Sequence, residues 1–96
     1  MTEKYEVQAA VYKAAIKYHY ALAQYYTAIN PARHGQGCKE AADKTRVAAG
    51  AYRDTLATLL AYMLSAGDVG FTMAEIEDAT RRIDLLDVET KTIRDA

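Results

Sequence analysis

Apolar and polar residues separate onto two faces when residues 5–29 are placed on a helical wheel. The apolar face comprises Val7, Val11, Ala14, Ala15, Tyr18, Leu22, Tyr25, Tyr26 and Ile29. The opposite face comprises Glu6, Lys13, Lys17, Gln24 and Thr27. The stretch holds no Gly or Pro, so the pattern predicts a long amphipathic helix over about residues 4–29.

A second helix is predicted over about residues 38–66. Its apolar positions recur at three- and four-residue steps: Ala41, Thr45, Ala48, Tyr52, Leu56, Leu59 and Met63. Pro31 and two glycines, Gly35 and Gly37, precede this helix, and they predict a loop that reverses the chain. Gly67 follows it as a helix stop.

The third predicted helix, over about residues 72–94, has the clearest local signal. Thr72 and Glu75 match a capping box, and Phe71 and Ile76 flank it as a hydrophobic staple. A narrow apolar seam follows, made of Ile76, Ala79, Ile83, Leu86, Thr90 and Ile93. Such a seam suits a bundle or coiled-coil partner.

These elements predict an all-α fold: an antiparallel helical hairpin plus a third helix, forming a three-helix bundle in one domain over residues 1–96. The chain has 19 alanines but only 18 Leu, Ile, Val and Phe residues together, so its own core offers little apolar area. We therefore expect self-association, as a dimer or higher homo-oligomer. A swapped arrangement, with the third helix on a neighbouring chain, is an alternative.

Six of the eight tyrosines lie in the first helix. Tyr5, Tyr12, His19 and Tyr26 recur every seven residues in one column, and Tyr18 and Tyr25 form a second. Tyrosine rings suit a core edge, a subunit interface or a ligand wall, and the sequence does not choose among them. The residues predicted to contact another chain are Lys13, Lys17, Tyr18, Tyr20, Gln24, Ile83 and Leu86.

The net charge of −1 hides an asymmetry between the two halves of the chain. Residues 1–53 carry eight Lys or Arg and four Asp or Glu, whereas residues 54–96 carry four and nine. Packing of the acidic third helix against the basic half explains this simply. The surplus is too weak for a nucleic-acid footprint, so we do not expect a nucleic-acid partner.

The cellular compartment is predicted from cysteine content and from the search for a signal peptide or membrane span in the sequence. A single cysteine suits a reducing compartment, and the first residues do not follow the plan of a signal peptide. No stretch approaches the roughly 20 apolar residues that a membrane span needs. We expect a cytoplasmic protein.

Catalytic and metal-binding patterns are weak. His34 and Cys38 are four residues apart, but a zinc site needs further ligands, and His19 is a whole helix away. Cys38 beside Lys39 has the setting of a lowered thiol pKa, yet no second residue builds a catalytic site around it. We expect no enzyme activity, no metal and no cofactor.

An anion site is the better chemical candidate. The start of the second helix gathers backbone N–H groups and cations, with tyrosine rings at the same end of the hairpin. The candidate ligand-binding residues are Arg33, His34, Gly35, Gly37, Lys39, Tyr25 and Tyr26. The Gly-Lys-Ser/Thr ending of a P-loop is missing.

Two functions follow as hypotheses. The first is a non-enzymatic helical interaction protein that acts as an adaptor, regulator or inhibitor of a larger macromolecule, of the kind that phages and other mobile elements encode; its partner is another protein. The alternative is an oligomeric binder of a small anionic or nucleotide-like ligand at the Arg33–Lys39 loop.

Overall fold

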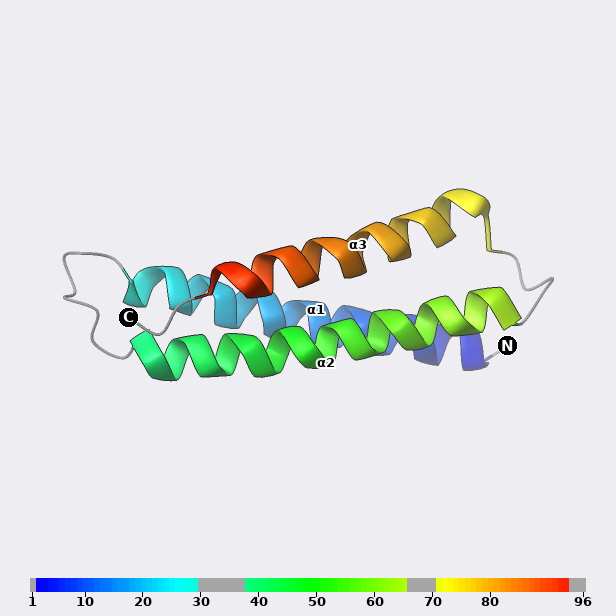
Figure 1. The fold of residues 1–96 in the computed structure, drawn as a ribbon. Helices are drawn as coiled ribbons and strands as arrows, with labels where there is room; N and C mark the ends of the chain where they lie inside the picture. Colours follow the sequence, from blue (N-terminus) through cyan, green and yellow to red (C-terminus); the bar gives the residue numbers. More distant parts are fainter. Residues whose placement is uncertain (1, 30–37, 66–70, 94–96) are drawn as a thin grey trace.

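The computed structural model describes residues 2–29, 38–65 and 71–93, which form three helices (Figure 1). They are α1 (Thr2–Ala28), α2 (Cys38–Ser65) and α3 (Met73–Thr92). The prediction of an all-α bundle is confirmed. The predicted helix ends at residues 66 and 94 lie outside the part that the structure describes, as do the helix stop at Gly67 and the predicted turn between the first two helices.

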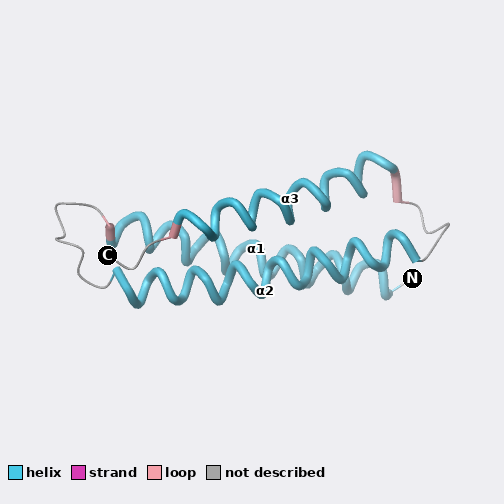
Figure 2. The backbone as a smooth tube through the Cα atoms, viewed as in Figure 1, coloured by secondary structure: helices cyan, strands magenta, loops and turns pink. Residues whose placement is uncertain are grey.

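α1 and α2 run antiparallel, and α3 returns along them (Figure 2). The principal dimensions, 52 × 23 × 15 Å, are those of a rod. α1 and α2 share the most extensive contact, α3 lies mainly on α2, and α1 and α3 touch at few points. Each helix therefore has one packed face and a long exposed one.

The core follows most of the predicted apolar steps, but in the first half of α2 the buried alanines are Ala42 and Ala49, whereas the expected Ala41 and Ala48 are half-buried. Tyr18, Thr45 and Leu56 are the largest fully buried side chains. The Thr45 hydroxyl donates to the carbonyl of Ala21 on α1 at 3.1 Å and to that of Ala41 on its own helix at 2.7 Å. A buried hydroxyl is stable only when it is hydrogen-bonded, so Thr45 also fixes the position of α2 on α1.

The core narrows toward the hairpin end of α1. Here Tyr25 and Ile93 enclose Ala42 in a small separate cluster, with Leu22, Ala28 and Ala41 packed against it. The larger cluster holds the branched and long side chains of the second half of α2. The apolar positions of α2 are thus small in its first half and large in its second half, and the core is wider at the second half.

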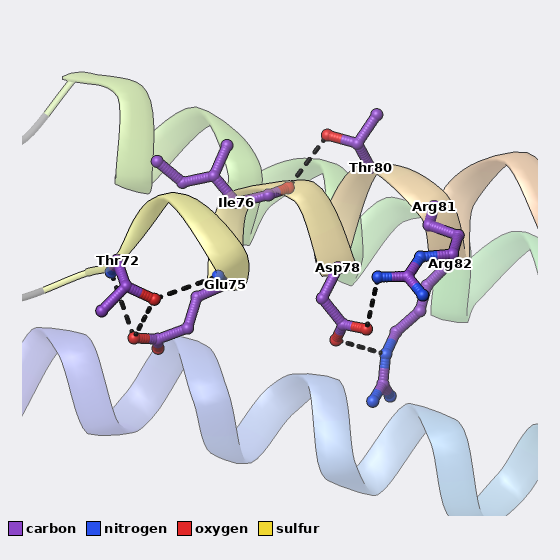
Figure 3. A network of polar contacts seen from close by, with 7 residues as sticks. All are labelled: Thr72, Glu75, Ile76, Asp78, Thr80, Arg81 and Arg82. Carbon is purple, nitrogen blue, oxygen red and sulfur yellow. Dashed lines mark hydrogen bonds and ion pairs between the residues drawn. The ribbon is translucent and has the colours of Figure 1, made fainter.

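The start of α3 has the predicted capping box (Figure 3). The Glu75 N–H donates to the Thr72 hydroxyl at 3.1 Å, and the Thr72 N–H donates to the Glu75 carboxylate at 3.1 Å. Such caps contribute about 1 kcal/mol. Phe71 and Ile76 both pack against the main core, in the positions of a hydrophobic staple.

The seam of α3 packs on the chain's own hairpin. Ala79, Leu86 and Ile93 are buried, and Ile76, Ile83 and Thr90 are half-buried. The seam is therefore used within the chain, and the swapped arrangement is not needed to cover it.

Ion pairs along α3 differ in part from the expected spacing. The spacing of four residues predicts that Asp78 pairs with Arg82, Glu77 with Arg81 and Asp87 with Lys91. Asp78 does pair with Arg82 at 2.8 Å, and it also lies 3.8 Å from Arg81 (Figure 3). Asp87 is held by Arg53 of α2 at 2.7 Å, a contact that the sequence of α3 alone does not contain. Arg53, from another helix, therefore binds the Asp87 carboxylate, for which spacing along α3 predicts Lys91 as the partner.

Candidate interaction surface

The two tyrosine columns of α1 have opposite environments. Tyr18 and Tyr25, of the second column, are 0% and 5% exposed and belong to the core. Tyr5, Tyr12 and Tyr26, of the first column, are 69%, 67% and 57% exposed. Tyr18 and Tyr25 thus pack inside the bundle, whereas the tyrosines of the first column are exposed in the single chain.

The exposed side chains of α1 form a longer line than the tyrosines alone. We call it the outer column, and it consists of Tyr5, Ala9, Tyr12, Ile16, His19, Ala23 and Tyr26. All seven are exposed, Ile16 by 70%. Their spacing alternates between four and three residues, which on an α-helix produces a single stripe of the coiled-coil kind. Tyr20, 67% exposed, lies beside it.

The outer column extends along almost the whole of α1. From residue 5 to residue 26 a helix rises about 32 Å, at about 1.5 Å per residue. Isolated exposed apolar side chains are ordinary, but a continuous line of them usually marks a contact surface. Within the chain, the ring of His19 lies 6.3 Å from that of Tyr52, and the ring of Tyr26 lies 5.7 Å from that of Tyr25. Most of the surface of Tyr5, Tyr12 and Ile16 is left uncovered by the bundle.

Sequence reasoning found only part of this surface. The seven-residue recurrence of Tyr5, Tyr12, His19 and Tyr26 was visible, but Ala9, Ile16 and Ala23 were not connected with it. Tyr26 and Ile29 were expected on the core face, whereas they are 57% and 38% exposed. The alternating step of four and three residues was the signal that would have completed the stripe.

The predicted contact residues fall into two groups. Lys13, Lys17, Tyr20 and Gln24 are exposed, so their side chains are accessible to a partner. Tyr18 and Leu86 lie in the core of the chain itself, and Ile83 is half-buried against it. The last three were expected at an interface because apolar seams suit a partner; here the partner is another helix of the same chain.

The predicted anion site lies almost wholly outside the described residues. Arg33, His34, Gly35 and Gly37 belong to residues 30–37. Lys39 is exposed at the start of α2. Tyr25 is buried, so its ring face is not available for stacking, and Tyr26 is the exposed ring at that end of α1.

Two of the grooves along α1 differ in their lining. One, of about 360 Å³, lies between α1 and α3, with Val11, Leu59 and Met63 among its lining residues and Tyr12 at its edge. The other, of about 670 Å³, lies between α1 and α2, where Lys13, Lys17 and Lys44 accompany alanines and Val47, which is 74% exposed. Both are open at the surface, unlike the enclosed pockets typical of small-ligand sites.

Tyr18 is the strongest polar link between α1 and α3. Its hydroxyl donates to the Glu89 carboxylate at 2.9 Å. Burial raises the pKa of Tyr18 above its ordinary value, and the hydrogen bond to the Glu89 carboxylate raises it further. Both causes favour the protonated phenol, the form that can donate.

This raised pKa predicts a loss of stability in alkaline solution. Above about pH 10 the unfolded chain releases the Tyr18 proton while the folded chain keeps it, so the free energy of unfolding falls as pH rises. For one proton the slope is about 1.4 kcal/mol per pH unit. Urea denaturation between pH 8 and pH 11 should show a steeper decline for the wild type than for Tyr18→Phe. Equal slopes would contradict this explanation.

The other shifted groups are also tied to neighbouring helices. A hydrogen bond to Arg53 lowers the pKa of Asp87, and the same contact raises the pKa of Arg53. The pKa of Arg82 is raised chiefly by its hydrogen bond to Tyr52 of α2. Perturbed pKa values also occur in catalytic sites, but here each belongs to a contact that joins two helices of the bundle.

Among residues 2–29, 38–65 and 71–93, no three His, Cys, Asp or Glu side chains lie close enough together to hold a metal ion. None of the three helices, over the residues described, is long and apolar enough to cross a membrane. No protein-family model matches the chain, and no curated protein or solved structure matches it either.

Proposed function

We propose that this chain is a non-enzymatic helical interaction protein whose contact surface is the outer column of α1. The observation that carries the proposal is the line of exposed side chains, which are Tyr, Ile or Ala at every position except His19 and are 57–70% exposed at Tyr5, Tyr12, Ile16 and Tyr26. Covering such a line with another protein surface removes apolar area from water, which is the main driving force of association.

The composition of the column fits this role. Tyrosine is enriched at protein interfaces because its ring supplies apolar area and its hydroxyl remains satisfied by water or a partner. Tyr20 beside the column, with Lys13, Lys17 and Gln24, adds a polar border of the kind that surrounds an apolar interface centre. An adaptor, regulator or inhibitor needs no more than such a surface on a rigid helix.

A site-specific photo-crosslinking scan in the protein's own host cells tests this function. A benzophenone amino acid is placed at Tyr12 or Tyr20 on the column side, and at the exposed positions Thr58 of α2 and Arg81 of α3 as matched controls. We expect protein adducts at Tyr12 and Tyr20 and few at the controls. Equal yields at all four positions, or no adducts at Tyr12 and Tyr20, would contradict the proposal.

A further inference from the structure

We propose that the outer column is covered by a second copy of this chain, in an antiparallel helix pair related by a twofold axis near Ile16. This inference rests on the proposed function and names the partner of its surface. Three properties of the column carry it: its area, the distribution of ring and aliphatic side chains, and the charge of the chain.

The exposed area matches what a dimer needs. A tyrosine side chain buries about 150–250 Å² when it is fully covered. With the exposed fractions given above for Tyr5, Tyr12 and Tyr26, and with Ile16 and the smaller residues included, the column exposes on the order of 600 Å². Two copies then bury about 1,200 Å², which is the lower limit of specific, stable interfaces.

The side chains of the column alternate between rings and aliphatics. One of the two heptad positions holds Tyr5, Tyr12, His19 and Tyr26, and the other holds Ala9, Ile16 and Ala23. All the rings thus share one heptad position, and all the aliphatic side chains share the other.

This separation of rings and aliphatic side chains into two heptad positions favours an antiparallel pair of α1 helices over a parallel pair. In a parallel pair each core position faces its own copy, so layers of two rings alternate with layers of two aliphatic side chains. In an antiparallel pair each ring position faces an aliphatic position, so every layer combines one of each. Helices pack at a nearly constant separation set by the side chains between them. Layers of equal size fit that requirement, whereas alternating Tyr–Tyr and Ala–Ala layers do not.

The column also suits a twofold symmetric contact. Read from either end it runs ring, Ala, ring, Ile, ring, Ala, ring. A reversed second copy that is displaced by one position along the helix therefore places an aliphatic side chain opposite a ring in each shared layer, and the twofold axis lies between Ile16 and a neighbouring ring. A twofold interface uses the same patch on both chains, so such a patch must be complementary to its own reverse. The net charge of −1 gives little electrostatic repulsion between two copies.

Cysteine cross-linking tests both the partner and the direction. The single native cysteine is removed as Cys38→Ser, and Ala9→Cys and Ala23→Cys are made separately in that background, one of them with a tag that changes its mass. Replacing these exposed alanines disturbs the bundle little, and circular dichroism checks that the variants are helical. In an antiparallel pair Ala9 lies within about one turn of Ala23 of the second copy, whereas two copies of either residue are at least about 15 Å apart along the axis.

We expect wild-type protein to sediment as a dimer at micromolar concentration. A short bis-maleimide should join the two variants when they are mixed and equilibrated, and should not join either variant to itself. Cross-links within each single variant would overturn the antiparallel arrangement. A dimer with neither kind of cross-link would place the contact elsewhere and overturn the proposal, as would a monomer. A monomer that still gives photo-adducts of another protein at Tyr12 would leave the proposed function standing.

Discussion

Leu56→Ala is expected to lower the free energy of unfolding by about 3 kcal/mol, measured by urea denaturation followed by circular dichroism. Leu56 is 1% exposed in the main core cluster, between Tyr52 and Leu59 in the line of α2. Removing its branched end loses the transfer free energy of those atoms and leaves a cavity that the surrounding helices fill only partly. A domain of this size has about 5–15 kcal/mol in total, so the loss is a large fraction.

Leu64→Ala is the matched control on the same helix. Leu64 is 67% exposed, and alanine has at least as high a helix propensity as leucine. We expect a change within about 0.5 kcal/mol. Similar losses for the two variants would mean that α2 is covered on both sides, which would contradict the packing described for the single chain.

The fold was predictable because several local signals agree. The apolar steps of α2, the capping box at Thr72 and the seam that contains Ala79 and Leu86 each indicate a helix and the face that it buries. All three are found, although in the first half of α2 Ala42 and Ala49 are buried in place of Ala41 and Ala48. These signals depend on neighbours three or four residues apart, which a sequence displays directly.

The environment of the tyrosines was not predictable for a physical reason. Tyr18 and Tyr25 recur seven residues apart, and Tyr5, Tyr12 and Tyr26 belong to a column with the same seven-residue recurrence, so two stripes on α1 have the same residue type and the same period. Alanines fill many of the intervening positions and suit a packed or an exposed face equally. Which of the two stripes is buried depends only on where α2 and α3 lie against α1. Their placement depends on contacts between residues far apart in the sequence, such as Tyr18–Glu89.

The proposed anion site shows a second limit of prediction from the sequence. The prediction combined residues 33–39 with Tyr25 and Tyr26 because they are near in sequence. In the fold, the ring of Tyr25 packs with Ala42 and Ile93. Ile93 is the residue that follows α3, far from the hairpin turn in the sequence. A prediction made from the hairpin turn alone cannot include the burial of Tyr25 by the end of α3.

Ile16→Glu is expected to weaken self-association by about 100-fold or more, a free energy of about 2.8 kcal/mol. Ile16 is 70% exposed in a single chain, so the substitution should leave the free energy of unfolding of that chain nearly unchanged. In the proposed pair the residue lies near the twofold axis, so both copies lose apolar contact and two carboxylates approach one another. Central apolar positions carry most of an interface's binding energy. Sedimentation velocity over a concentration series measures the dissociation constant.

Val47→Glu separates this effect from changes in net charge. Val47 is 74% exposed on α2, away from the outer column, and its substitution also replaces a β-branched aliphatic side chain by glutamate on a helix. Both variants therefore gain one negative charge and undergo the same change of residue class, but only Ile16 lies in the column. We expect Val47→Glu to dimerise within about threefold of the wild type, a difference of less than about 1 kcal/mol. If the two variants weaken the dimer equally, charge repulsion explains the loss; if only Val47→Glu does, the groove between α1 and α2 is the surface that joins the two copies.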